Sequence, residues 1–284
     1  MAQPRRVTRL VRGLPTSDGA GVRLTRVIGI PELRNLDPFL MLDHFGSEQA
    51  ADYISGFPNH PHRGFETVTY MLEGRMRHRD NQGNEGLLTS GSVQWMTAGR
   101  GLIHSEMPEQ EEGRMSGFQL WINLPAAQKM CAPRYQDIAP ERIPEVEPLP
   151  GARVRVLAGE YGGVRGPVDA EATAPLYLDV ALPAGAALTL PVPAGHTAFA
   201  YVFEGRAALA GQAVAQDVMA LLSDGDALQV EASEGPARLI LVAGRPLREP
   251  IVQYGPFVMN TTEEIQQAIA DYQRGAFGPM RATG

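Results

Sequence analysis

The feature that most constrains the fold is a long series of short apolar runs separated by glycine, proline, aspartate or serine. The 31 glycines and 23 prolines are spread along the whole chain instead of gathering in one linker. Many short strands joined by turns are typical of sandwiches and barrels, so the chain is predicted to be all-β. The expected strands are TVTYML, SVQWMT, GFQLWINL, ARVRVLAG, APLYLDVAL, TAFAYVF, DALQVEA and ARLILVAG.

One segment near the C-terminus breaks this rhythm and predicts a helix over about residues 261–274. Thr261 is followed three residues later by Glu264, which is the spacing of a capping box. Apolar side chains then recur at the spacing of one helix face until Gly275 ends the pattern. The residues on this face, which is expected to be buried, are Ile265, Ala268, Ile269 and Tyr272.

A chain of 284 residues is long enough for two domains. The heptapeptide TYMLEGR, ending at Arg75, matches AYVFEGR, ending at Arg206, in kind at every position, which indicates that one structural unit occurs twice. The stretch RIPEVEPLPG is rich in proline and glutamate and lacks a core periodicity, so it is predicted to be an extended linker. The predicted division is a domain at 1–141, the linker at 142–151, a second domain at 152–248, and a tail at 249–284 that carries the helix.

The net charge and the cysteine content exclude several kinds of partner and of metal site. A net charge of -7 and a pI near 5.4 argue against direct binding of nucleic acid. No apolar run is long enough for a signal peptide or a membrane span, so a cytoplasmic protein without a membrane partner is expected. Cys131 is the only cysteine, which excludes an intramolecular disulfide and a thiolate cluster. Any metal must therefore be held by histidine and carboxylate.

Two pairs of residues have the types and spacing of metal ligands. His60 and His62 lie two apart in FPNHPHRGFETVTYMLEG, and side chains at i and i+2 of a strand point to the same face. His104 and Glu106 have the same spacing in GSVQWMTAGRGLIHSEMP. One such pair alone favours a surface turn that happens to carry two histidines. Two pairs together would supply three imidazoles and one carboxylate to a single centre.

These two stretches resemble the two motifs of the cupin superfamily: HxH with an acidic residue four positions on, then Gly-x5-Thr-x-Gly leading to a later histidine. They resemble the pirin family in particular, together with NLDPFLMLDHFG, GFQLWINLP and GPFVMNTTEEIQQAIADYQRGAFG, so the resemblance covers most of the chain. It implies a bicupin of two jelly-roll-type β-barrels with a C-terminal helix, in which the N-terminal barrel binds one metal. The implied ligands are His60, His62, His104 and Glu106.

The second repeat lacks such a set. Aligned on the shared Glu-Gly-Arg, the counterparts of His60 and His62 are Pro191 and Pro193, and His196 is the only histidine nearby. A lone histidine cannot build this kind of site. The C-terminal barrel is therefore expected to be free of metal, as the resemblance also implies.

The spacing departs from most cupins, where the carboxylate ligand belongs to the first motif; that residue would be Glu66 here. Four residues separate Gly99 from His104, and this even-numbered lengthening preserves strand parity, so His104 and Glu106 still share a face. Glu106 is therefore favoured as the ligand. Glu66 is expected instead to accept a hydrogen bond that orients an imidazole or Arg63, as partners of ligating histidines do.

The resemblance implies a metal-dependent dioxygenase of the quercetinase type, which opens the heterocyclic ring of flavonols with O2 and releases carbon monoxide. The expected cofactor is one divalent transition metal; Fe(II) is favoured, and Ni, Co, Mn and Cu stay open because ligand type alone does not choose among them. The expected partners are O2 and a flavonol or similar enolisable aromatic, with Glu106 as the catalytic base for the 3-hydroxyl. The alternative is a metal-dependent regulatory or redox-sensing module that acts on protein partners without turnover.

Overall fold

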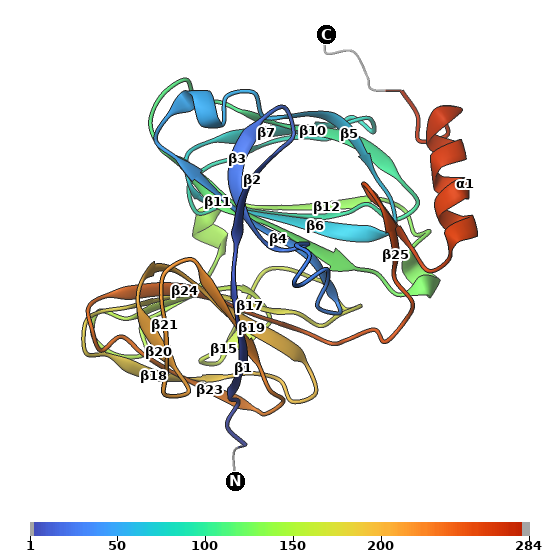
Figure 1. Cartoon of the computed structure of the whole chain (residues 1–284). Helices are drawn as coiled ribbons and strands as arrows, with labels where there is room; N and C mark the ends of the chain where they lie inside the picture. Colours follow the sequence, from blue (N-terminus) through green and yellow to red (C-terminus); the bar gives the residue numbers. More distant parts are fainter. Residues whose placement is uncertain (1–2, 280–284) are drawn as a thin grey trace. The chain divides into compact units, whose positions relative to one another are not determined.

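The computed structural model describes residues 3–279 and confirms an all-β chain with one α-helix (Figure 1). The described residues divide into two compact units. The unit that we call the first barrel contains residues 15–29, 39–140 and 247–279, and the second barrel contains residues 3–14, 30–38 and 141–246. No helix in the part of the chain described here is long and apolar enough to cross a membrane.

The first barrel is made of two antiparallel sheets. One has the order β12-β9-β6-β11-β4-β3-β2, from Arg134–Ile138, Val93–Thr97, Phe65–Glu73, Met115–Asn123, Phe39–Ser47, Val22–Ile28 and Leu14–Asp18. The other has the order β5-β10-β7-β8, from Phe57–His62, Leu102–Pro108, Met76–Asp80 and Glu85–Leu88. Short 3-10 helices follow β4 at Ala50–Asp52, β11 at Ala126–Gln128 and β12 at Pro140–Arg142.

The second barrel has the same plan. Its larger sheet runs β1-β22-β19-β24-β17-β14-β13, from Val7–Arg12, Val218–Leu222, Thr197–Gly205, Ala237–Gly244, Leu176–Leu182, Arg153–Ala158 and Glu145–Val146. Its smaller sheet runs β18-β23-β20-β21, from Ala187–Pro191, Ala227–Glu231, Ala207–Leu209 and Gln212–Val214. A further two-stranded ribbon pairs β15, Glu160–Tyr161, with β16, Val164–Arg165.

The two halves of the sequence repeat occupy equivalent strands. TYMLE lies at the end of β6 and AYVFEG at the end of β19, and each strand is third in its sheet. β6 lies between β9 and β11, as β19 lies between β22 and β24, and the smaller sheets correspond strand for strand in chain order. This matching topology supports the duplication that the two heptapeptides indicate.

The boundaries of the two units differ from the predicted division in two places. β1, which the division puts in the N-terminal domain, pairs with β22 and so belongs to the second barrel. The predicted linker at 142–151 contains β13, which pairs with β14, and Ile143 in the same stretch is buried. Edge strands are held by backbone hydrogen bonds on one side only, so they need no core periodicity in their sequence.

The interior of the second barrel is aliphatic. Val156, Leu178, Leu190, Leu228 and Leu241 are fully buried members of one cluster. The two prolines aligned with the histidine pair are exposed on or beside β18. Among its described residues, this barrel holds no group of three potential ligand side chains with converging donor atoms.

The predicted helix is confirmed as α1, Thr262–Gln273, which follows the hairpin of β25, Val252–Tyr254, and β26, Phe257–Met259. The Thr261 hydroxyl accepts a hydrogen bond from the Glu264 amide at 3.2 Å, and the Glu264 carboxylate accepts one from the Thr261 amide at 3.0 Å, which completes the capping box. One part of the helix prediction is wrong. Tyr272 is 39% exposed, and Asp271 is buried beside it.

His44 on β4 is a packing residue whose ring stacks on Phe118 of β11, with centroids 4.7 Å apart. Burial, and secondarily the charge of Arg114, lowers the pKa of His44 from 6.5 to about 4. The unfolded chain therefore binds this proton at higher pH than the folded chain. The resulting stabilisation is complete above pH ~6.5 and is lost as the pH falls towards ~4, a change of up to about 3 kcal/mol.

We therefore expect His44→Phe to weaken the acid sensitivity of folding. The free energy of unfolding, measured by urea denaturation at pH ~4.5 and ~7.5, should fall less between these values in the variant than in the wild type, by roughly 2–3 kcal/mol. The comparison across pH cancels any constant effect of the new ring on packing. The same pH dependence in both proteins would contradict the assignment.

Candidate metal centre

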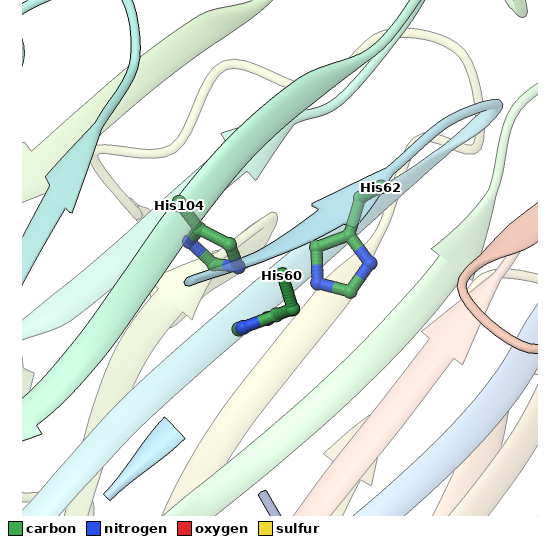
Figure 2. Close-up of side chains that lie close together, drawn as sticks. All are labelled: His60, His62 and His104. Carbon is green, nitrogen blue, oxygen red and sulfur yellow. The ribbon is translucent and has the colours of Figure 1, made fainter. Parts of the chain in front are cut away.

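Three histidines converge on one point inside the first barrel (Figure 2). His60 and His62 come from β5, and His104 comes from β10, directly opposite His60 in the antiparallel ladder. One ring nitrogen from each of the three lies within 4.8 Å of the other two. Among residues 3–279, this is the only group of three or more such side chains with donor atoms so close together.

The local sequence explains this convergence. The i and i+2 spacing of His60 and His62 places both on one face of β5, as the sequence predicts. The loop before β10 is turned by Gly99, at φ +50°, where a Cβ atom would lie 2.3 Å from the Cys131 carbonyl oxygen. Only glycine fits there without moving the backbone. The approach of His104 to β5 therefore depends on this glycine.

The three rings suit a divalent metal ion. Burial, and then the charge of His60, lowers the pKa values of His62 and His104 well below the ordinary histidine value. Both rings are thus neutral, as a metal ligand must be. Neither ring nitrogen of His104 has a hydrogen-bond partner, although the side chain is fully buried. Such orphaned groups are costly, and coordination would satisfy one of them.

His60 is oriented by its own strand. Its Nδ1 lies 2.7 Å from the Pro58 carbonyl oxygen, and a carbonyl only accepts, so we place the ring proton on Nδ1. The Nε2 lone pair then remains for a metal. A backbone carbonyl that fixes the tautomer of a ligating histidine is a common arrangement in metal sites.

Glu106 lies outside the three-histidine group in the structure. It is buried on β10, and its carboxylate is held by two side chains of the larger sheet. The Thr69 hydroxyl lies 2.9 Å from Oε1, and the Gln119 amide donates to Oε2 at 3.2 Å. Thr69 and Gln119 were not predicted as site residues. A polar residue inside each of the apolar runs TVTYML and GFQLWINL was the available signal.

Glu66 and Arg63 are not brought together. Glu66 on β6 accepts a hydrogen bond from the Thr97 hydroxyl at 2.7 Å, and its burial raises the pKa of its carboxyl group. Because it lies three residues from Thr69, it points to the opposite face of the sheet. Arg63 pairs instead with Asp271, at 2.7 Å. The structure thus gives Arg63 a different carboxylate from the one expected.

Aromatic side chains form an apolar wall beside the histidines. The Trp121 ring lies edge-on to His62, with centroids 5.2 Å apart, and contacts Phe65 at 4.4 Å. Phe65 also meets His62 edge-on at 5.1 Å. Trp95 and Phe118 are buried like Phe65, and Phe118 stacks on His44. Trp121 and Phe65 therefore cover the His62 side of the three rings with apolar surface.

Comparison with known proteins gives consistent results over most of the chain. The family model described as Pirin matches residues 21–122, and the one described as Pirin C-terminal cupin domain matches residues 177–278. A Pseudomonas aeruginosa protein named "Putative quercetin 2,3-dioxygenase" is 53% identical over 282 residues, which cover 97% of this chain and 99% of that protein. A "Pirin-like protein" of Caulobacter vibrioides is also 53% identical, over 274 residues, which cover 96% of this chain and 99% of that protein.

A solved structure is similar along its whole length. The crystal structure of a quercetin 2,3-dioxygenase from Acinetobacter baumannii superposes with a TM-score of 0.91 at 34% sequence identity. The match covers 98% of this chain and 100% of that one. The overall fold is therefore shared with a protein of that name.

Proposed function

The chain belongs to the pirin family, and we propose that it is a metal-dependent dioxygenase of the quercetinase type. Its substrate would be a flavonol or another enolisable aromatic, whose heterocycle is opened with O2 and loss of carbon monoxide. The observation that carries this proposal is the set of three converging imidazoles beside an apolar wall and a buried carboxylate. The names of the relatives support the same reaction class.

His60, His62 and His104 would hold the metal, with Glu106 as the proposed fourth ligand after a rotation of its side chain. Three neutral imidazoles and one carboxylate leave a divalent ion with a formal charge of about +1 and open coordination positions. The metal would supply Lewis acidity towards an enolisable hydroxyl. Fe(II) is the proposed metal, with Ni, Co, Mn and Cu as the alternatives to test.

Glu106 is placed to take and keep a proton. When ionised, it accepts hydrogen bonds from Thr69 and Gln119. When protonated, it can donate to the Thr69 oxygen, because the Thr69 hydroxyl lies 2.6 Å from the Gln119 carbonyl oxygen and can donate there instead. In the protonated state every polar atom of this network has a partner, whereas in the ionised state the single Thr69 hydroxyl hydrogen goes to the carboxylate and the Gln119 carbonyl oxygen loses it. We therefore assign Glu106 the proton of the flavonol 3-hydroxyl, while Trp121 and Phe65 exclude water from the reacting ring.

The test is anaerobic reconstitution with each candidate metal, followed by admission of oxygen and quercetin. Flavonol absorbance, oxygen uptake and carbon monoxide release are recorded together. The proposal expects one O2 consumed and one carbon monoxide released per flavonol, with no reaction in the metal-free protein or in His62→Ala. Absence of oxygen uptake with every stoichiometrically bound metal would overturn it and favour the regulatory module.

A further inference from the structure

The C-terminal segment, residues 252–277, is joined to the first barrel at the residue that follows His62. The Arg63 amide donates to the Pro256 carbonyl at 3.2 Å, and the Val258 amide donates to the Arg63 carbonyl at 3.1 Å. These bonds form a parallel bridge between Arg63 and Phe257. In Figure 1, β25 and α1 accordingly lie along the same barrel as β5 and β10.

The Arg63 side chain links the loop after β5 and the loop before β10, which flank the histidines, to α1. Its Nε donates to the Arg100 carbonyl oxygen at 2.6 Å, in the loop that leads to His104. Its Nη1 donates to the Asp271 carboxylate at 2.7 Å. The guanidinium also lies over the Phe277 ring, 4.5 Å from its centroid. The buried Arg63 side chain, directly after His62, therefore contacts both the loop that leads to β10 and the C-terminal helix.

Both loops are shaped for close contact with this segment. Gly64 has φ +91°, and a Cβ atom there would lie 2.0 Å from the Val258 carbonyl oxygen. Gly101 has φ +126°, and a Cβ atom there would lie 2.7 Å from the Phe277 ring. Either substitution would push the segment away. The close approach is thus built into both ends of the histidine site.

Lys129 also holds Gly64 close to β26. It is buried, and its ammonium donates to the Gly64 carbonyl at 2.8 Å and to the Val258 carbonyl at 3.0 Å. The Asn123 side-chain oxygen accepts its third hydrogen bond, at 2.5 Å. All three donors of the ammonium are used, so Lys129 fixes the distance between β26 and Gly64, which lies two residues after His62.

We propose that the C-terminal segment is a positioning element of the metal centre and acts through the Asp271–Arg63 ion pair. This inference rests on the proposed metal site, not on the dioxygenase reaction. Without Asp271, the buried guanidinium loses its counter-charge, and its hold on Arg100 weakens. The loops that present His62 and His104 are then free to separate, and three nitrogens that must meet one ion lose their preset spacing.

The test compares Asp271→Asn with Glu263→Gln, which removes a charge from an exposed position of the same helix. Ni(II) affinity is measured by competition with a chromophoric chelator, and the thermal midpoint of each metal-free protein is recorded. Asp271→Asn is expected to raise the dissociation constant about 10-fold, the lower end of the effect of losing a hydrogen-bond partner of a metal ligand, because Asp271 acts on the histidines only through Arg63. Glu263→Gln is expected to bind as the wild type does.

A second variant and a spectrum separate positioning from a general loss of stability. Arg63→Lys keeps the charge for Asp271, but its single nitrogen lacks the fork that also holds Arg100. It should weaken Ni(II) binding as Asp271→Asn does, and it provides the test if that variant does not fold. In both variants, the electron paramagnetic resonance spectrum of bound Cu(II) should differ from that of the wild type.

The outcomes that count against the inference are distinct. Unchanged Ni(II) affinity and an unchanged Cu(II) spectrum in a folded variant would overturn the positioning role while leaving the metal site intact. A wild-type protein that binds neither ion would overturn the metal site, and with it both this inference and the proposed function. Metal binding without flavonol turnover would remove only the proposed reaction.

Discussion

His104→Ala is expected to abolish stable metal binding and, with it, oxygen-dependent loss of flavonol. His104 supplies one of three converging nitrogens, and its ring lies 4.4 Å from His60 and 4.9 Å from His62, centroid to centroid. Losing a direct ligand should weaken binding by more than the about 10–100-fold that follows from losing an outer partner. Metal content after loading and gel filtration, measured by mass spectrometry, should fall from one ion per chain to a trace.

The matched control is His196→Ala, which removes a histidine from the second barrel and should leave one metal ion per chain. Thermal unfolding of the metal-free proteins distinguishes a lost ligand from a lost fold. Full metal content in folded His104→Ala would show that His104 is not a ligand. Loss of metal in His196→Ala would show that the ion binds in the second barrel, not in the first.

Glu106→Gln is expected to lower turnover far more than metal content. The amide keeps the shape of the side chain and can still accept from the Thr69 hydroxyl, but it cannot take a proton at neutral pH. Removing a general base typically costs a factor of about 10²–10⁴ in rate. Single-turnover decay of quercetin absorbance should slow by this factor in samples whose metal content per chain is measured in parallel.

Thr69→Val provides the companion to this experiment. It removes one hydrogen-bond partner of the Glu106 carboxylate but leaves the acid in place, so it should slow the reaction less than Glu106→Gln does. If Glu106→Gln instead lowers metal content and turnover in equal proportion, the carboxylate acts only as a ligand. Unchanged turnover in Glu106→Gln would remove it from the reaction altogether.

The architecture was readable from the sequence because its signals are local. Glycine and proline mark the turns between strands, the Thr261 and Glu264 pair marks a helix start, and the spacing of His60 and His62 fixes a common face. Each signal depends on a few neighbouring residues and on backbone geometry. The repeat is not a local signal, because its halves end at Arg75 and Arg206, but it needed only a comparison of the chain with itself.

The sequence could not show towards which face of the sheet the Glu66 side chain points. β6 is buried on both faces from Phe65 to Met71, so its sequence shows no alternation that separates the barrel interior from the other side. Without that alternation, parity tells which residues share a face but not which face meets the histidines. Thr69 as a partner of Glu106 depends on the same unreadable choice.

Long-range charge pairing accounts for the other difference. The periodicity of α1 favours Tyr272 on the buried face, whereas the structure buries Asp271 against Arg63. Helical periodicity is detected from apolar side chains alone, so it cannot show that Asp271 has a buried cationic partner, Arg63, far away in the sequence. The pairing of β1 with β22 could not be predicted for a similar reason, because the sequence of an edge strand does not specify which strand it pairs with.

The contacts of residues 256–271 with Arg63 and Lys129 are expected to form late during synthesis. The strands that carry the three histidines are complete once residue 108 has been made, but Asp271 and the Val258 carbonyl leave the ribosome only after the whole second barrel. Closing so long a loop is slow, so these contacts are expected to be still missing in the nascent chain. Loading of the proposed metal is therefore expected to come after these contacts form, when the supply of ions in the surrounding medium decides which one enters.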